Sequence, residues 1–494
     1  MKDRVAKSVF WIVWSKGGVQ GIGLLSTLFI ARLLTPADYG LVSLAAIWIF
    51  PIAMLAEMGL GAAIVQFRDI TEKELNGCFW LINGIALLGY FVLYASAPVI
   101  AQWFDAPMLS PVLRVNGILL PLTAFRVVPD SLLRKSLALD KVAKAEIVGA
   151  VLTIPTMLAL ALAGAGVWTL VGGMLMSSFA QTVLTFWFLP WKPGWTFGGE
   201  RIIEVLRFSI STLGSKLCWA MYRQADFFVL GKVSGDVVLG FYSMAKQLAT
   251  LPVDKISTVV NQLASPVMAE LQDQRSAMQV SLLRGLRLVA LIAFPACIGL
   301  LLVAEDLIHV LLTDKWSEAV PALQILSLYA FIRSLDILLP PVLMARFRTR
   351  FLFTYSFALF AVMPLAFLAG AAWGGAIGVA IAWVAVYPIL MLRMAQEAFR
   401  EVGLSWLNLL KQLSSTLAAT ATMATVLAAV AWGLSAWPHD MALIRLLLMV
   451  VTGMIVYGGS LFFMDEAIYE ELRQVIWWAL GKGTLKPSKA LATA

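Results

Sequence analysis

Apolar runs of about 20 or more residues recur along almost the whole chain, and each is long enough to cross a lipid bilayer as an α-helix. The runs follow one another from residue 8 to residue 464 and leave no stretch for a soluble domain. Only 13% of the residues are charged, against about 25% in soluble domains. We therefore predict an all-α polytopic membrane protein with about 14 transmembrane helices. Their expected ranges are 8–34, 40–65, 76–104, 111–133, 143–163, 166–190, 205–230, 238–267, 282–303, 318–342, 351–371, 374–396, 413–435 and 441–464.

Lysine and arginine gather in every second connection between these runs. The two termini and six alternate connections hold 25 basic residues, whereas the opposite connections hold only four. Cytoplasmic loops of membrane proteins are enriched in basic residues, so both termini are predicted to be cytoplasmic. This distribution also accounts for the net charge of +8, and we infer no nucleic-acid partner from it.

A stretch near the N-terminus is repeated in outline about 200 residues later. Residues 29–51 align with residues 228–252, and Leu-Ala-Gly-Ala runs at 162–165 and 368–371 mark two short outer turns. Repeats of this long period in a hydrophobic chain indicate two homologous helix bundles. The predicted organisation is an N-lobe at 1–190, a cytoplasmic linker at 191–204, a C-lobe at 205–400, two further helices within 401–465, an interfacial amphipathic helix at 466–482 and a disordered tail at 483–494.

The first copy of the repeat contains a tight corner between two helices. Thr35 is a preferred N-cap residue, and Asp38 stands three positions later, where a capping box places its acid. Pro36 suits the first helical position. Gly40 follows, and Gly240 takes the corresponding place in the second copy. The spacing predicts a helix that begins directly after Thr35.

Several ionisable side chains interrupt the apolar runs, although a charge at the bilayer centre costs about 2.5–3.5 kcal/mol on insertion scales. The first two helices of each half would meet at a pseudo-twofold axis, where substrate sites lie. Cations outnumber acids on these helices, so we predict a wet, net-positive central cavity that attracts an anion such as a pyrophosphate. The alternative is that some of the lysines extend toward the headgroups from helix ends. The substrate-binding candidates are Lys16, Lys216, Arg223, Lys246 and Lys255, and the coupling or gating candidates are Glu57, Asp226 and Asp254.

Two further charge pairs occupy matching places in the two halves. Arg126 and Asp130 are four residues apart, and Arg333 and Asp336 are three apart, so each pair shares one helix face. We predict intrahelical pairs, which either brace each bundle or take part in function.

Three segments carry a family resemblance. They are ARLLTPADYGLVSLA at 31–45, Gly61-Ala-Ala-Ile-Val-Gln66, and the Leu133-Arg-Lys start of the loop that follows. These segments resemble Wzx-type flippases, and most closely the WzxC-like polysaccharide transporters of the MOP superfamily. The resemblance covers the chain from about residue 5 to residue 465. It implies two six-helix lobes with pseudo-twofold symmetry, plus two extra helices.

The resemblance also implies a function. A protein of this kind flips undecaprenyl-pyrophosphate-linked oligosaccharide from the cytoplasmic to the periplasmic leaflet of the bacterial inner membrane by alternating access. Its products serve exopolysaccharide, O-antigen or capsule biosynthesis. Its expected partners are the lipid-linked glycan, membrane lipids, and a polymerase and glycosyltransferases of the same pathway.

The sequence points to no catalytic residue, metal site or cofactor. The three cysteines and two histidines are scattered, without the spacing of a metal site. No nucleotide-binding loop is present, so an H⁺ or Na⁺ gradient is the expected energy source. Two other functions stay open at this point: a membrane-embedded polysaccharide polymerase or ligase, and a MATE-like cation-coupled exporter. The short outer loops argue against the first, and the cationic balance of the cavity argues against the second.

Overall fold

The computed structural model describes residue 23 and residues 28–67, 70–196, 202–434, 437 and 441–464. These residues form helices joined by short turns, and they include no strand. Ten helices in this part of the chain are long and apolar enough to cross a membrane, which confirms the all-α polytopic fold. Most of the predicted first helix, the side chain of Lys16 and the predicted interfacial helix at 466–482 lie outside the described residues.

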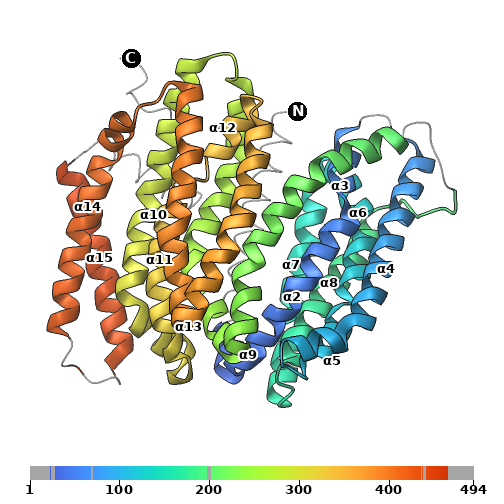
Figure 1. The fold of residues 1–494 in the computed structure, drawn as a ribbon, viewed down its shortest axis with the longest axis horizontal. Coiled ribbons are helices and arrows are strands. Elements are labelled where there is room, and N and C mark those ends of the chain that lie inside the picture. The colour runs from blue at the N-terminus through green and yellow to red at the C-terminus, as the bar shows by residue number, and fades with distance from the viewer. Residues whose placement is uncertain are drawn as a thin grey trace. The chain divides into compact units, whose positions relative to one another are not determined.

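Figure 1 follows the helices from blue at the N-terminus to red at the C-terminus. In chain order they are α2 (Pro36–Glu57), α3 (Leu60–Gln66), α4 (Glu72–Trp103), α5 (Leu109–Asn116), α6 (Leu119–Lys135), α7 (Leu139–Leu162), α8 (Trp168–Phe188), α9 (Ile202–Glu270), α10 (Arg275–Leu312), η1 (Asp314–Ala319), α11 (Val320–Arg333), α12 (Leu339–Ala345), α13 (Thr349–Val402), α14 (Trp406–Gly433) and α15 (Ala442–Met464).

The two longest helices each contain a break that divides them into two segments. In α9 the break is at Gly235, which has a φ of 83°. In α13 it is at Gly374 and Gly375, and the second of these has a φ of 53°. Positive φ is easily adopted by glycine, because glycine has no Cβ atom. The break in α13 lies within the turn predicted after the second Leu-Ala-Gly-Ala run.

The corner before α2 has the predicted capping box. The Thr35 side chain accepts a hydrogen bond from the Asp38 amide at 3.4 Å, and the Asp38 carboxylate accepts one from the Thr35 amide at 2.9 Å. These bonds satisfy two amide groups that a helix N-terminus leaves without partners. The cap therefore explains why α2 begins at Pro36 with no intervening loop.

The start of α2 crosses the second segment of α9 at backbone distance. A Cβ atom on Gly40 would lie 1.8 Å from the carbonyl oxygen of Asp236, and a Cβ atom on Gly240 would lie 1.8 Å from that of Pro36. Any larger residue would force the two helices apart. The two glycines that the repeat places in correspondence therefore make reciprocal contacts, each with the other's corner.

The chain divides into two compact units. Unit 1 comprises residues up to Met244 together with Ser356–Val379, and unit 2 comprises Ala245–Tyr355 and the chain from Ala380 onward. The predicted lobe boundaries at 1–190 and 205–400 stay a prediction. In unit 1, a buried cluster that includes Leu60, Phe79 and Val128 joins α3, α4 and α6.

Unit 2 contains two buried clusters. One packs α10, α12 and the end of α13 around Phe294, Val342 and Phe399. The other packs α14 and α15 against α10 and includes Met423 and Met449. Figure 1 shows α14 and α15 side by side, and α10 contacts both of them. Apolar packing of this kind fixes the helices that carry the charged residues of unit 2.

Candidate functional site

Unit 2 gathers five of the predicted ionisable residues on α9, α11 and the turn that follows α11. Lys246 lies on the second segment of α9, where its Nζ atom is 4.9 Å from the ring centroid of Trp383 on α13. A lysine over the face of an indole ring is stabilised by a cation–π interaction. The indole therefore helps to hold a positive charge where the surroundings are apolar.

The Trp383 ring belongs to a buried aromatic triad. Its centroid is 4.4 Å from that of Tyr329 and 5.8 Å from that of Tyr387. All three side chains are almost completely buried. The triad is thus a packed support for Lys246, because its ring faces are covered by one another and by neighbouring helices.

An ion pair joins α9 to α11 in the same unit. Nη2 of Arg333 lies 2.8 Å from Oδ1 of Asp254, and the exposed fractions of the two side chains are 17% and 44%. The Tyr387 hydroxyl donates a hydrogen bond to the Asp336 carboxylate. Each acid therefore binds a donor from another helix. Lys255, the next residue after Asp254, is half-buried.

The ion pair of Arg333 differs from the prediction, which paired this residue with Asp336. Unit 1 departs from the prediction in the same way. Asp130 pairs with Arg134 at 2.6 Å, and Arg126 donates a hydrogen bond to Gln181 of α8. Within a helix, an acid on the N-terminal side of its base is the better arrangement. The predicted pairs have the base first, whereas Asp130 and Arg134 have the acid first.

Asp226 is completely buried in unit 1. The Tyr242 hydroxyl donates a hydrogen bond to its Oδ2 atom at 2.7 Å, and the Phe227 amide donates one to its Oδ1 atom at 2.9 Å. A buried carboxylate needs such donors, because an unsatisfied one is very costly. Asp226 therefore has a structural explanation in addition to the predicted coupling role.

Glu57 and Arg223, two more of the predicted residues, are both exposed. Glu57 is exposed at the end of α2, and Arg223 is exposed on the first segment of α9. The backbone at Lys216 is helical, but its side chain and that of Lys16 are outside the described part of the chain. One cavity shared by all eight candidates stays a prediction.

Lys246, Asp254, Arg333 and Asp336, with their partners, form the unit 2 network. The aromatic residues that organise this network were not predicted from the sequence. Tyr329 stands four residues before Arg333, and Trp383 stands four before Tyr387, so each pair shares a helix face. This spacing was a usable signal. Tyrosine and tryptophan are common in apolar helices, however, and their link to the charges depends on the packing of α11 against α13.

Comparison with known proteins identifies the family. The family model described as "Polysaccharide biosynthesis protein" matches residues 29–321. Lipopolysaccharide biosynthesis protein WzxC of Escherichia coli (strain K12) is 24% identical over 428 residues, which cover 82% of this chain and 85% of that protein. Succinoglycan biosynthesis transport protein ExoT of Rhizobium meliloti (strain 1021) is 27% identical over 328 residues, which cover 66% of each chain.

Two solved structures share the fold. The inward closed conformation of the lipid II flippase MurJ has a TM-score of 0.70 at 14% identity, covering 95% of this chain and 99% of that chain. An inward-facing MATE family transporter of the MOP superfamily has a TM-score of 0.63 at 14% identity, covering 77% and 94%. The names of ExoT, MurJ and the MATE family protein describe transport or flipping, and the name of WzxC describes lipopolysaccharide biosynthesis.

Proposed function

This chain belongs to the polysaccharide biosynthesis protein family and has the fold of the MOP superfamily transporters, and on this premise we propose the following substrate and direction. The protein flips undecaprenyl-pyrophosphate-linked oligosaccharide repeat units from the cytoplasmic to the periplasmic leaflet of the bacterial inner membrane. It works by alternating access, and its substrate serves exopolysaccharide, O-antigen or capsule biosynthesis. Both termini face the cytoplasm.

The unit 2 network is the observation that carries this proposal. Lys246 and Arg333 place two cations on apolar helices, each held by a specific partner. A pyrophosphate or an acidic sugar that leaves water needs such counter-charges, because charge interactions strengthen as the local dielectric falls. Arginine suits this task, since its planar guanidinium forms paired hydrogen bonds with phosphate oxygens.

The Arg333–Asp254 pair also suggests how transport is coupled to an ion gradient. A phosphate oxygen that approaches Arg333 competes with the Asp254 carboxylate for the same guanidinium hydrogens. A displaced carboxylate near apolar helices favours uptake of H⁺ or Na⁺ to restore neutrality. On this account, substrate and coupling ion bind together, and the change in charge favours the opposite-facing state. Glu57 and Asp226 are the other candidates for the coupling role.

A flipping assay in proteoliposomes tests the proposed function. The wild-type protein is reconstituted with undecaprenyl-pyrophosphate-linked oligosaccharide, with and without H⁺ or Na⁺ gradients, beside protein-free vesicles. We expect protein-dependent movement of the head group, at a higher rate under one gradient. A parallel sample with a neutral, pyrophosphate-free lipid glycan should be flipped much more slowly. Equal rates in protein-containing and protein-free vesicles under every gradient would contradict the proposal.

A further inference from the structure

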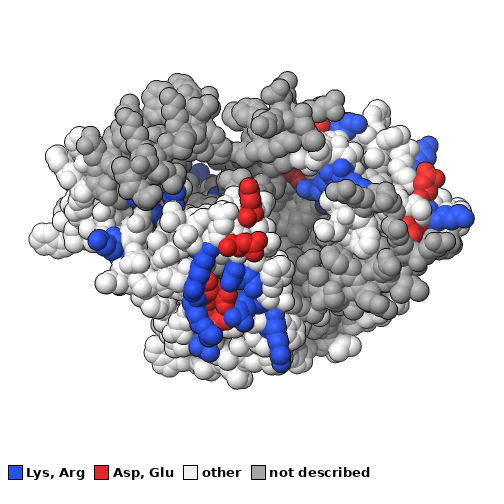
Figure 2. Space-filling model, turned by 90° about the horizontal axis from the view of Figure 1, so that it is seen from above, with Lys and Arg blue, Asp and Glu red and all other residues white. Residues whose placement is uncertain are grey.

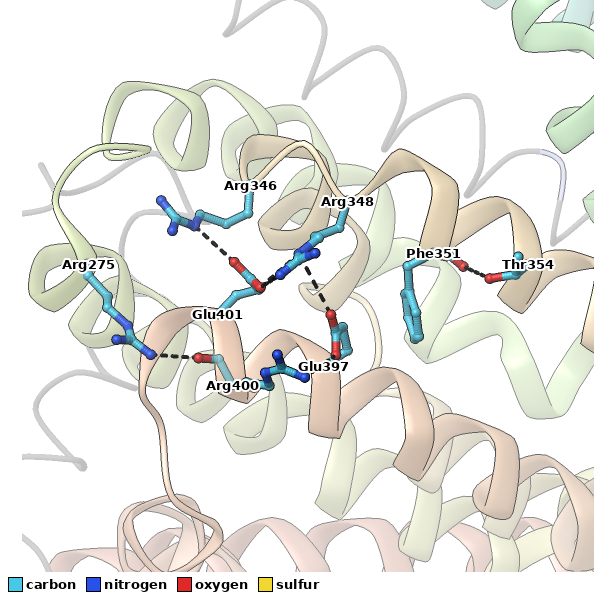
Figure 3. Close-up of polar contacts among 8 residues, drawn as sticks. All are labelled: Arg275, Arg346, Arg348, Phe351, Thr354, Glu397, Arg400 and Glu401. Atoms are coloured by element: carbon cyan, nitrogen blue, oxygen red, sulfur yellow. Dashed lines mark hydrogen bonds and ion pairs between the residues drawn. The ribbon is translucent and has the colours of Figure 1, made fainter.

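A second charged cluster lies at one end of unit 2, where the α12–α13 turn meets the end of α13. The Arg348 guanidinium donates to Oε1 of Glu401 through Nε and Nη2, at 2.8 and 2.6 Å. Nε of Arg346 lies 3.3 Å from Oε2 of the same glutamate. Glu397 lies 3.7 Å from Arg348 and 3.9 Å from Arg400. Figure 3 shows the side chains converging from the two segments.

The cluster also includes the turn between α9 and α10. Nη2 of Arg275 donates to the carbonyl oxygen of Arg400 at 2.6 Å, and Nη1 of Arg346 donates to that of Gln272 at 2.8 Å. The two arginines therefore tie this turn to the rest of the cluster. Three arginines share two glutamates, so these ion pairs carry a positive surplus. The distribution of basic residues predicts that this end of unit 2 is cytoplasmic.

An apolar side chain projects from the middle of the cluster. Phe347 stands between Arg346 and Arg348, and 79% of its surface is exposed. Its φ is 57°, a left-handed conformation that bulky residues rarely adopt. Strained residues of this kind concentrate at binding and switch sites. Met344, three residues before Phe347, and Leu407, six residues after Glu401, are also exposed, by 59% and 75%.

We propose that this surface binds the headgroup of an anionic phospholipid in the cytoplasmic leaflet. The arginines supply charge-assisted hydrogen bonds to the phosphate, and Phe347 inserts at the boundary between headgroups and acyl chains. In Figure 2, basic and acidic side chains of the described residues gather in a mixed patch on the face seen from above. Clusters of basic residues just inside the membrane attract anionic lipids.

The exposed apolar residues favour a lipid over a soluble anion. Free phosphate or pyrophosphate would use the arginines but would gain nothing from Phe347. A phospholipid uses both, because its phosphate and its acyl chains are joined in one molecule. The site lies outside the unit 2 network, whose charges Lys246, Asp254 and Arg333 are proposed to act in transport. Lipid binding here and head-group flipping there are therefore separate properties.

The test measures lipid binding to the purified full-length protein. Native mass spectrometry counts the phosphatidylglycerol molecules retained in detergent, and thermal unfolding is followed as phosphatidylglycerol, phosphatidylcholine or inorganic pyrophosphate is added. One variant is Arg400→Gln, because this side chain is 77% exposed and its nearest carboxylate is 3.9 Å away. The other is Phe347→Asn, because asparagine accepts a positive φ. Neither variant should unfold the protein.

We expect phosphatidylglycerol, and not phosphatidylcholine, to stabilise the wild type. Arg400→Gln should weaken phosphatidylglycerol binding about fivefold, which corresponds to about 1 kcal/mol per basic residue near an anionic surface. Phe347→Asn should weaken it as well while leaving stability without lipid unchanged or higher. Lys144→Gln is the matched control, since this exposed lysine of unit 1 carries the same charge and should have no effect.

Three results would overturn the proposal. One is equal stabilisation by phosphatidylcholine and phosphatidylglycerol. Another is equal weakening by Lys144→Gln and Arg400→Gln, which would indicate a general charge effect. The third is stabilisation by pyrophosphate that matches stabilisation by phosphatidylglycerol and is unaffected by Phe347→Asn, which would assign the surface to a soluble anion or to the pyrophosphate of a substrate.

Discussion

Two charged networks of unit 2 differ in how their charges are partnered. In the deep network, Arg333 pairs with Asp254 from another helix, and Lys246 lies over Trp383. In the network at the end of the unit, Arg346 and Arg348 share Glu401. The deep charges each have a specific partner on apolar helices. The arginines of the end network instead share one acceptor: they are 34% and 44% exposed, around a Glu401 side chain that is only 9% exposed.

This difference explains why the two networks should respond differently to mutation. Removing one member of a partly desolvated pair leaves the other charge uncompensated, which is destabilising. Removing one partly exposed arginine of the end network costs little, because Glu401 keeps the other arginine as a partner. A charge on an apolar helix costs free energy, so its presence there makes it a good candidate for a functional residue. The following variants test this contrast, from the largest expected effect to the smallest.

Arg333→Leu should have the largest effect. It leaves the Asp254 carboxylate without its arginine, and we expect a loss of about 2–3 kcal/mol of unfolding free energy, below the full buried-pair value because Asp254 is 44% exposed. Denaturant titration in detergent measures it. The double variant Arg333→Leu/Asp254→Leu should recover most of the stability and remain inactive in flipping. A double variant as unstable as the single one would show that the pair is not the cause.

Tyr387→Phe removes the hydroxyl that donates to Asp336. The half-buried carboxylate loses a donor, so we expect a loss of about 1 kcal/mol in unfolding free energy. The same titration measures it, with Tyr355→Phe as the control, a ring of the same type elsewhere in unit 2. A loss that is equal in both variants would argue against a specific role for the Asp336 contact.

Lys246→Met keeps the length of the side chain and removes its charge. The cation–π contact with Trp383 contributes about 0.5–2 kcal/mol, and removing a half-buried charge from an apolar helix offsets part of that loss. We therefore expect only a small change in stability, measured by thermal unfolding. A large loss of stability would assign Lys246 a structural role and would make its transport phenotype uninformative.

Arg348→Gln in the end network should have the smallest effect on stability. The hydrogen bond to Glu401 raises the pKa of Arg348 above its usual value. The stability that Arg348 contributes is therefore fully present below the pKa that this arginine has in the unfolded chain, and it is lost only above any working pH. The difference in unfolding free energy between this variant and the wild type should thus be equal at about pH 6 and about pH 9. It should shrink in high salt. A strong pH dependence in this range would contradict the assignment.

The sequence predicted local features well because they depend on neighbouring residues. The capping box at Thr35 and the turn that contains Gly375 both follow from residue types within a few positions. The depth of the charged residues follows from the length of the apolar runs around them. The correspondence of Gly40 and Gly240 was visible as a repeat, and the structure adds the reciprocal backbone contact.

The partners of the charges could not be predicted in the same way. Spacing suggested that Arg126 pairs with Asp130, yet Asp130 pairs with Arg134 and Arg126 contacts Gln181. Arg333 likewise pairs with a residue 79 positions away. Such contacts depend on which helices pack together and on how each is rotated, and a single sequence does not encode this in its spacing.

The most direct test of the account compares the flipping rates of wild type, Lys246→Met and Lys232→Met in the same proteoliposomes. Lys232 is the matched control, because its Nζ atom lies 5.4 Å from the ring of Trp103 in unit 1 and contacts Asp105 in the turn that follows α4. We predict that Lys246→Met loses about tenfold in rate, as expected when one phosphate contact of about 1.4 kcal/mol is removed, while Lys232→Met transports like the wild type. Wild-type rates in a folded Lys246→Met variant would contradict the claim that the deep network of unit 2 binds the anionic head group.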